Sequence, residues 1–191
     1  MRIVASSLSK SFGSKTIFAG VSFDIEGSVW AIIGPNGSGK TTLMRMMAGL
    51  LRASSGTMEW FDRKKKYEKF QLSGRIAMCS PDLGLYKEMT VFENARFFAN
   101  LAGVPVPDFG VWGLSCHLEK RYQELSAGLK QRAKLMTAFA MARDVILLDE
   151  PEQHLDAEGK AILDNMVSSF GRLVVVATNN PWRDWRKIAQ F

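Results

Sequence analysis

Eight consecutive residues, 34 to 41, constrain the fold of this chain more than any other segment. They follow the pattern G-x-x-x-x-G-K-[ST], which is typical of loops that bind phosphate groups. An apolar segment of strand length, Val29–Ile33, precedes the loop, and apolar residues recur at helical spacing from Leu43 to Leu50. The sequence therefore predicts a strand, a glycine-rich turn and a helix in direct succession, an arrangement that belongs to α/β folds.

The residue types of this loop suit the chemistry of phosphate binding. Glycines let the backbone bend closely around an anion, and the helix that follows adds the positive end of its dipole. Lys40 is expected to reach the β- and γ-phosphates of a nucleotide, and the Thr41 hydroxyl to ligate Mg²⁺. An ordinary glycine-rich turn is the alternative, but the complete pattern and its flanking segments favour binding. The predicted phosphate-binding residues are Gly34, Pro35, Asn36, Gly37, Ser38, Gly39, Lys40, Thr41 and Thr42.

A second candidate group of side chains follows the apolar segment Val145–Leu148, where Asp149 and Glu150 stand next to each other. The carboxyl end of a strand is the edge at which open α/β sheets bind ligands. We assign Asp149 to the metal and Glu150 to orienting or deprotonating the attacking water. Two adjacent acids could instead begin a solvated loop, but the phosphate loop upstream favours a site.

Strand-like and helix-like segments alternate along the chain, which predicts an α/β protein with a mostly parallel sheet and an antiparallel β element at the N-terminus. The expected strands cover residues 3–6, 21–25, 29–33, 57–61, 75–79, 145–148 and 173–177. Helices are expected over 91–101, 109–120 and 126–142, and these three form a helical insert. A further helix is expected between the last two strands, and Gly171 ends it. We expect a single domain over 1–191, with a core lobe of about 1–80 and 143–191 and a helical subdomain of about 81–142.

The composition limits the other classes of protein. Apolar residues make up 47% and charged residues 23% of the chain, which excludes disorder and a coiled coil as main interpretations. No apolar run approaches the roughly 20 residues that span a bilayer, and the first residues lack the apolar region of a signal peptide. Two cysteines, Cys79 and Cys116, fit a reducing cytosol. The net charge of +6 suits an anionic partner, but the basic run 63–66 lacks interleaved aromatics, so we interpret it as a solvated loop and expect no nucleic-acid partner.

A third motif completes a family pattern. Residues 125–132 read Leu-Ser-Ala-Gly-Leu-Lys-Gln-Arg and begin a predicted helix a short distance before the paired acids. With these three motifs in this order, the chain resembles the ATP-binding cassette (ABC) ATPases, the motor subunits of transporters, over nearly its whole length. The resemblance implies a P-loop NTPase core and a signature, usually L-S-G-G-Q, in which Ser126, Gly128 and the helix N-terminus bind a γ-phosphate. Ala127 and Leu129 depart from that signature, and on its own Ser126 would be an ordinary helix cap.

The resemblance also implies cofactors and partners. In this family two cassettes pair head to tail, so that each ATP, with Mg²⁺, lies between the phosphate loop of one chain and the signature of the other. It implies a second cassette, most simply in a homodimer, and a separate membrane-spanning subunit whose short helix enters a groove near residues 80–103. Asp156 resembles the acid of the loop that crosses the dimer interface. Phe12 resembles the aromatic residue that stacks on adenine, with a packed core phenylalanine as the alternative.

Two family positions are occupied by other residues. Asn179 stands where the family usually has a histidine that contacts the γ-phosphate; its amide can donate a hydrogen bond but carries no charge. Where the family commonly has a glutamine after a strand, Asp82 is the nearest polar candidate to approach the metal. Glu150 remains in place, so we expect hydrolysis that is slowed by the loss of these two side chains.

These observations predict the ATP-binding and ATP-hydrolysing subunit of a transporter, located in the cytoplasm and peripheral to the cytoplasmic face of the membrane. The compact length resembles small cassettes of haem-exporter and multidrug-type systems. Three alternatives stay open. A regulatory cassette with little hydrolysis is favoured by Asn179 and the missing glutamine. A soluble ABC ATPase of DNA repair or translation typically carries a second cassette or a long coiled-coil insert, and a P-loop kinase of small molecules is disfavoured by the signature segment.

Overall fold

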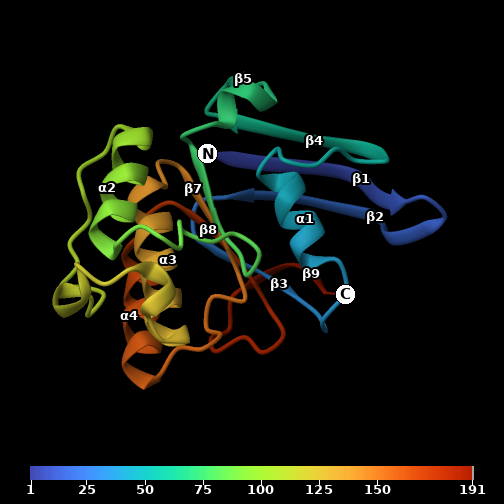
Figure 1. The fold of residues 1–191 in the computed structure, drawn as a ribbon. Helices are drawn as coiled ribbons and strands as arrows, with labels where there is room; N and C mark the ends of the chain where they lie inside the picture. Colours follow the sequence, from blue (N-terminus) through green and yellow to red (C-terminus); the bar gives the residue numbers. More distant parts are fainter. Residues whose placement is uncertain (191) are drawn as a thin grey trace.

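The computed structural model describes residues 1–190 as two β-sheets with helices between and around them (Figure 1). The first sheet is antiparallel, with the strand order β2-β1-β4-β5. A register shift between Ala5 and Leu8 in β1 keeps Ile3, Ala5 and Leu8 all on the buried face. The strands of this sheet are β1 (Arg2–Phe12), β2 (Lys15–Glu26), β4 (Ser55–Asp62) and β5 (Lys65–Tyr67).

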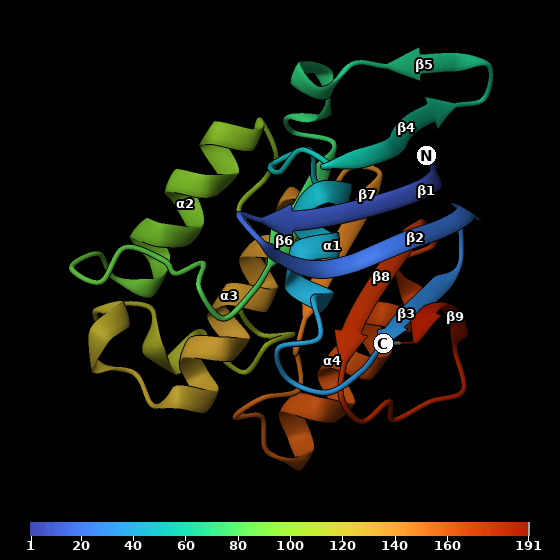
Figure 2. The ribbon, with the colours of Figure 1, turned by 90° about the vertical axis from the view of Figure 1, so that its right-hand side faces the viewer.

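The second sheet is parallel, with the strand order β6-β7-β8-β3-β9 (Figure 2). Its central strands β7 and β8 are buried along their whole length, as expected of strands covered on both faces. Because the strands run in the same direction, the carboxyl ends of β3, β7 and β8 meet at one edge of the sheet. The strands are β3 (Val29–Ile33), β6 (Ile76–Cys79), β7 (Val145–Asp149), β8 (Leu173–Thr178) and β9 (Arg186–Gln190).

The helices form the remaining layers of the molecule. Helix α1 lies between the two sheets, whereas α3 and α4 cover the opposite face of the parallel sheet, with α2 beside α3 (Figures 1 and 2). Side chains of β7 alternate accordingly: Val145 and Leu147 face the α1 layer, and Ile146 and Leu148 face the other helices. The helices are α1 (Lys40–Met47), α2 (Val91–Ala102), α3 (Ala127–Met141) and α4 (Ala157–Ser169), with short 3-10 helices at Lys69–Leu72, Ser115–His117 and Tyr122–Glu124.

Within residues 1–190, none of these helices combines the length and the apolar character that crossing a membrane requires. The predicted α/β architecture, with its mostly parallel sheet and its antiparallel N-terminal element, is confirmed.

The prediction of a helix over residues 109–120 is wrong. This segment forms turns and the short 3-10 helix at Ser115–His117. Gly113 has a φ of 65°, a left-handed conformation that ends a helix. Trp112 and Leu114 are buried in the core, but the backbone that carries them forms turns. Buried apolar residues in this turn segment therefore produced a sequence pattern that resembles that of a helix.

Candidate active site

The phosphate loop connects β3 to α1 and has a backbone that requires glycine. Gly39 has a φ of 104°, and a Cβ atom there would lie 2.7 Å from Ile17 Cγ2 of the neighbouring sheet. Gly37 has a φ of 78°, which also favours glycine. Helix α1 begins at Lys40, directly after this loop. The N–H groups of its first turn have no partner within the helix, so they are available to an anion.

Lys40 is the centre of the candidate site. Its side chain is buried, and its Nζ donates hydrogen bonds to Gly34 O (2.7 Å), Pro35 O (3.1 Å) and Asn179 Oδ1 (2.6 Å). The same Nζ lies 3.1 Å from Glu150 Oε1, an ion pair whose angles are not those of a hydrogen bond. The structure therefore brings the loop lysine, Glu150 and Asn179 together, although they are far apart in the sequence.

Asp149 and Thr41 form the second part of the site. Thr41 Oγ1 donates a hydrogen bond of 2.5 Å to Asp149 Oδ2, and the aspartate is almost completely buried. Asp149 Oδ1 is also buried and has no hydrogen-bond partner among residues 1–190. Burial raises the pKa of Asp149 above its usual value, and the nearby charge of Glu150 adds to this effect. A hydroxyl beside an unsatisfied carboxylate oxygen is a donor set that fits Mg²⁺.

The backbone of Glu150 adopts a conformation that is uncommon for a side chain of its size. Its φ is 48°, and its N–H donates to Ala177 O at 2.8 Å. This bond connects the first residue after β7 to the carboxyl end of β8. The strained backbone turns the Glu150 carboxylate towards Lys40, where only 9% of the residue is exposed.

Asn179, Asp82 and Phe12, the candidates at family positions, lie in different surroundings. Asn179 Nδ2 donates to Asn36 Oδ1 (2.8 Å), so this amide bridges Lys40 and the phosphate loop. The Asp82 carboxylate is mostly exposed and pairs with Arg45 at 2.6 Å, and its charge is one of the smaller contributions that raise the pKa of Asp149. Phe12 ends β1 with half of its surface exposed, and Lys10 Nζ lies 4.7 Å from its ring centre.

The signature residues contact a different group of elements. Ser126 caps α3 by accepting a hydrogen bond from Leu129 N (3.3 Å). A Cβ atom on Gly128 would lie 2.9 Å from His154 O, so this position requires glycine for close packing. Asp156 caps α4 and binds Arg132 Nη2 at 2.6 Å; the N–H of residue 159 and the arginine together lower the pKa of Asp156.

Two contacts that the sequence analysis did not identify hold the segment between β7 and α4. Gln131 Nε2 donates to Pro151 O (3.0 Å), which fixes this segment to α3. The Thr178 hydroxyl donates to Glu152 Oε1, which fixes it to the end of β8. An acid two residues after Glu150 was the available sequence signal, but its partner in β8 could not be inferred from spacing.

Comparisons with known proteins show the family to which the chain belongs. The chain matches the sequence model described as ABC transporter over residues 18–153. It is 32% identical over 188 residues to the cytochrome c biogenesis ATP-binding export protein CcmA of Cupriavidus necator, covering 93% of this chain and 82% of that protein. It is also 32% identical over 169 residues to the lantibiotic transport ATP-binding protein SrtF of Streptococcus pyogenes, covering 85% of this chain and 72% of that protein.

The fold is shared with a solved structure. A putative ABC transporter ATP-binding protein from Pyrococcus furiosus superimposes with a TM-score of 0.82 at 20% identity, over 99% of this chain and 97% of the other. At this identity the likeness supports the fold alone. The match to the sequence model covers well over half of the chain and includes the phosphate loop, Ser126, Gly128, Asp149 and Glu150, whereas Phe12, Asp156 and Asn179 lie outside it. The chain belongs to the ABC transporter family, as one of its nucleotide-binding domains.

Proposed function

We propose that this chain binds ATP with Mg²⁺ and hydrolyses it, and that closure of a cassette dimer on ATP energises a separate membrane-spanning subunit. The observation that carries the proposal is the convergence of Glu150 and Asn179 on the buried ammonium of Lys40, beside the pair Thr41–Asp149. This arrangement combines a phosphate-binding cation, a carboxylate base and a metal-binding pair within one edge of the sheet.

Each group has a distinct role in the proposed reaction. Thr41 and Asp149 would hold Mg²⁺, which when bound offsets negative charge on the phosphates. The Lys40 ammonium and the N–H groups of the loop stabilise the charge that develops on the γ-phosphoryl group. The Glu150 carboxylate accepts a proton from the attacking water. The water oxygen forms a bond to the γ-phosphorus while the bond between this phosphorus and the bridging oxygen breaks, so ADP leaves with the electron pair of that bond and inorganic phosphate is released.

The replaced family positions favour a slow ATPase. The amide of Asn179 can donate to a phosphate oxygen through Nδ2, but it cannot supply a positive charge. Asp82 could approach the metal or a metal-bound water only by leaving Arg45, and its charge would repel phosphate oxygens. A cassette that binds ATP with little hydrolysis is the second candidate function, and these two residues are the observations that favour it.

A second cassette would complete the site. Ser126 and Gly128 lie at the start of α3, where Ser126 is exposed and the N-terminal amides of the helix face outward from the cap. In a head-to-tail dimer, most simply a homodimer, these residues would bind the γ-phosphate held by the phosphate loop of the partner. Phe12 would stack on the adenine, and Asp156 would lie at the interface between the chains.

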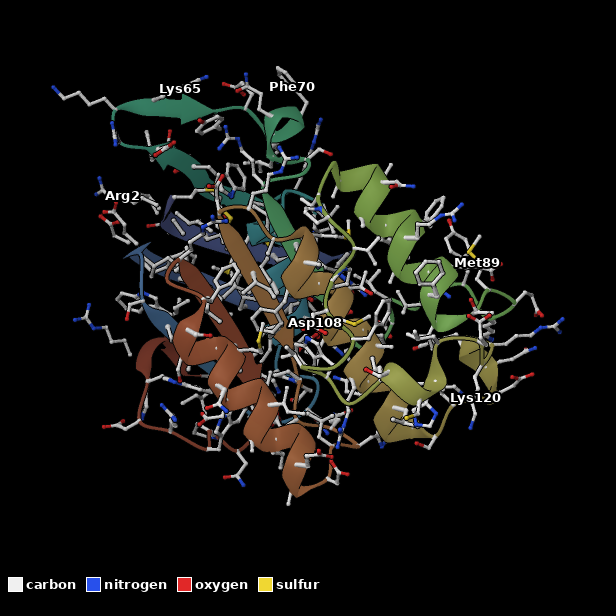
Figure 3. All side chains as sticks on the ribbon, turned by 90° about the vertical axis from the view of Figure 1, so that its left-hand side faces the viewer. Arg2, Lys65, Phe70, Met89, Asp108 and Lys120 are labelled. Atoms are coloured by element: carbon white, nitrogen blue, oxygen red, sulfur yellow. The ribbon has the colours of Figure 1, made fainter. Side chains whose placement is uncertain are left out.

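A groove next to α2 and α3 provides a docking site for the membrane subunit. It has a volume of about 510 Å³ and is lined mainly by apolar side chains, with Lys69 and Lys134 as its charged residues. Leu50 and Phe70 are strongly exposed at its rim, and Figure 3 shows Phe70 pointing away from the molecule. A short amphipathic helix of a membrane-spanning subunit would fit such a groove. Docking there would place the chain on the cytoplasmic face of the membrane.

Phosphate release by the purified chain tests the proposed function. With ATP and Mg²⁺, the wild-type chain should release phosphate, while Glu150→Gln should bind ATP and release on the order of a hundredfold less. Glu119→Gln, a change of an exposed glutamate in the insert, is the matched control and should keep the wild-type rate. Turnover that Glu150→Gln leaves unchanged would contradict the proposal. ATP binding without turnover, even with a membrane partner present, would favour the regulatory alternative.

A further inference from the structure

Glu152 makes a contact that the proposed reaction does not use. It lies in the segment between β7 and α4, two residues after Glu150, and its Oε1 accepts a hydrogen bond from the Thr178 hydroxyl. Thr178 is the last residue of β8 and is completely buried. Its hydroxyl also accepts a hydrogen bond from Asn180 N at 3.1 Å. The Thr178 hydroxyl therefore joins the two ends of the short turn that contains Asn179, and the Glu152 carboxyl group binds this hydroxyl.

This carboxyl group occupies an unfavourable position. Burial raises the pKa of Glu152, the charge of Glu150 adds to that effect, and Lys160 opposes it. Its Oε2 is buried without a hydrogen-bond partner among the residues described. An acid retained in such surroundings destabilises the fold unless its contact with Thr178 offsets the loss of hydration.

The same segment is fixed from its other side by α3. Gln131 Nε2 donates to Pro151 O at 3.0 Å, and the backbone of Gly128 packs closely against His154 O. The segment therefore connects the helix that carries the signature to the end of β8. A displacement of α3 therefore shifts Pro151 and Glu152, and through them the turn that contains Asn179.

Asn179 depends on accurate placement. Its amide oxygen accepts from Lys40 Nζ at 2.6 Å while its amide nitrogen donates to Asn36 Oδ1 at 2.8 Å. Both bonds must form at once, so a shift of about 1 Å at the end of β8 would break at least one of them. A misplacement of this size can lower a reaction rate by up to about a hundredfold.

We propose that Glu152 is a positioning residue, which acts through Thr178 to hold Asn179 against Lys40 and the phosphate loop. The inference rests on the proposed function, because it assigns Glu152 to the same reaction. Glu152 contacts a residue next to the site and not the reacting atoms, so its removal affects the rate of the reaction more than the affinity for ATP.

Four variants test the contact through turnover. Glu152→Ala should lower kcat about tenfold and leave the KM for ATP within about twofold. Glu152→Gln should restore most of the rate, since its amide oxygen accepts the same hydrogen bond. Thr178→Val should lower kcat at least as much as Glu152→Ala, because it removes the hydroxyl that bonds both Glu152 and Asn180 N, and combining the two changes should cause little loss beyond that of Thr178→Val. A Glu152→Gln variant as slow as Glu152→Ala, or a Glu152→Ala variant with the wild-type kcat, would overturn the proposal.

Amide hydrogen exchange tests the positioning without any turnover. The Asn180 amide should exchange faster in Glu152→Ala and Thr178→Val than in the wild-type chain, and Glu152→Gln should protect it as the wild type does. Glu119→Ala is the control. If Glu152→Ala does not fold, the exchange of the Asn180 amide can be compared between Thr178→Ser, which keeps the hydroxyl, and Thr178→Val, which lacks it. Unchanged exchange in the variants would refute the positioning role. A wild-type chain without turnover, even with a membrane partner present, would refute the proposed hydrolysis and leave the exchange result to decide this inference.

Discussion

Several charged side chains of the candidate site are held away from water by their neighbours. Lys40 and Glu150 are each about nine-tenths buried or more and lie 3.1 Å apart, and Asp149 lies beside Thr41 in the same edge. Charges in such surroundings interact more strongly than at the surface. A substitution of one side chain at this edge therefore changes the electrostatic energy of the others, so its effect on activity reports on the whole group.

The amide of Asn179 gives a first prediction. Asn179→Ala removes both bonds to Lys40 and Asn36, and kcat should fall by roughly tenfold to a hundredfold. Asn179→His keeps a hydrogen-bond donor and should retain more activity than Asn179→Ala. Its imidazole titrates, so the pH–rate profile should acquire a new limb within about a unit of pH 6.5. A wild-type rate in Asn179→Ala would show that this position takes no part.

The buried thiol of Cys79 gives a second prediction. Burial raises the pKa of Cys79 from 9.0 to about 11. Below about pH 9 both folded and unfolded chains keep the proton, so this thiol adds no pH dependence. Between about pH 9 and 11 the unfolded chain loses the proton first, and the free energy of unfolding should fall by at most about 3 kcal/mol.

Denaturant titrations over pH 8 to 11 measure this effect as a difference between variants. Cys79→Ala should reduce the pH dependence of the free energy of unfolding, while Cys116→Ala, at an exposed thiol, should keep the wild-type slope. Equal slopes in the wild type and Cys79→Ala would contradict the burial of this thiol in solution.

Sequence reasoning identified those candidate site residues that stand in contiguous motifs. The phosphate loop is recognisable because its backbone requires glycine at fixed positions, among them Gly39, and Asp149 and Glu150 follow a strand of evident apolar character. Glu152 and Thr178 could not be paired in this way. Their contact depends on β7 and β8 lying side by side, and no local pattern encodes that distance.

At the scale of elements, helix α3 combines a structural and a proposed functional role at its first residue. Ser126 accepts a hydrogen bond from Leu129 N, as an ordinary helix cap does, and it is also the candidate for binding the phosphate of a partner chain. Ser126→Ala should lose the cap and about 1 kcal/mol of stability. Ser126→Asp should keep the cap, because aspartate is an equally good cap residue, but its charge would repel phosphate.

Melting temperatures and phosphate release distinguish the two roles. Ser126→Asp should melt close to the wild type and yet hydrolyse ATP at least about tenfold more slowly. Glu119→Asp, another exposed change that leaves α3 untouched, serves as the control. Full activity in Ser126→Asp would restrict this residue to capping.

Two strands, β5 and β9, were not predicted from the sequence, and the same physical reason explains both omissions. Strand β5 is short and carries consecutive lysines, and β9 contains few apolar residues, so neither has the alternating pattern of a half-buried strand. Both lie at sheet edges, where pairing to a neighbour can form a strand without an apolar sequence. The error at residues 109–120 is the opposite case, because buried apolar side chains were present there without a helix.

At the scale of the whole molecule, the parallel sheet brings distant segments to one edge. The carboxyl ends of β3, β7 and β8 supply the phosphate loop, the paired acids and Asn179. The signature lies on α3 instead, and its contacts run to the segment between β7 and α4. This division is what a shared site between two copies would require: a phosphate loop from one chain and a signature from the other.

Mixing two impaired variants tests that arrangement directly. Lys40→Ala should abolish phosphate binding at the loop, and Ser126→Asp should disable the signature. In a mixed head-to-tail dimer both defects fall in one composite site, and the other site is intact. Random pairing of equal amounts should then recover about a quarter of the wild-type rate per chain. Each variant measured alone is the control: Lys40→Ala should stay inactive, and Ser126→Asp should reach at most about a tenth of the wild-type rate. If mixing recovers nothing while affinity capture through a tag on one variant shows that mixed dimers form, the site does not contain residues of both chains.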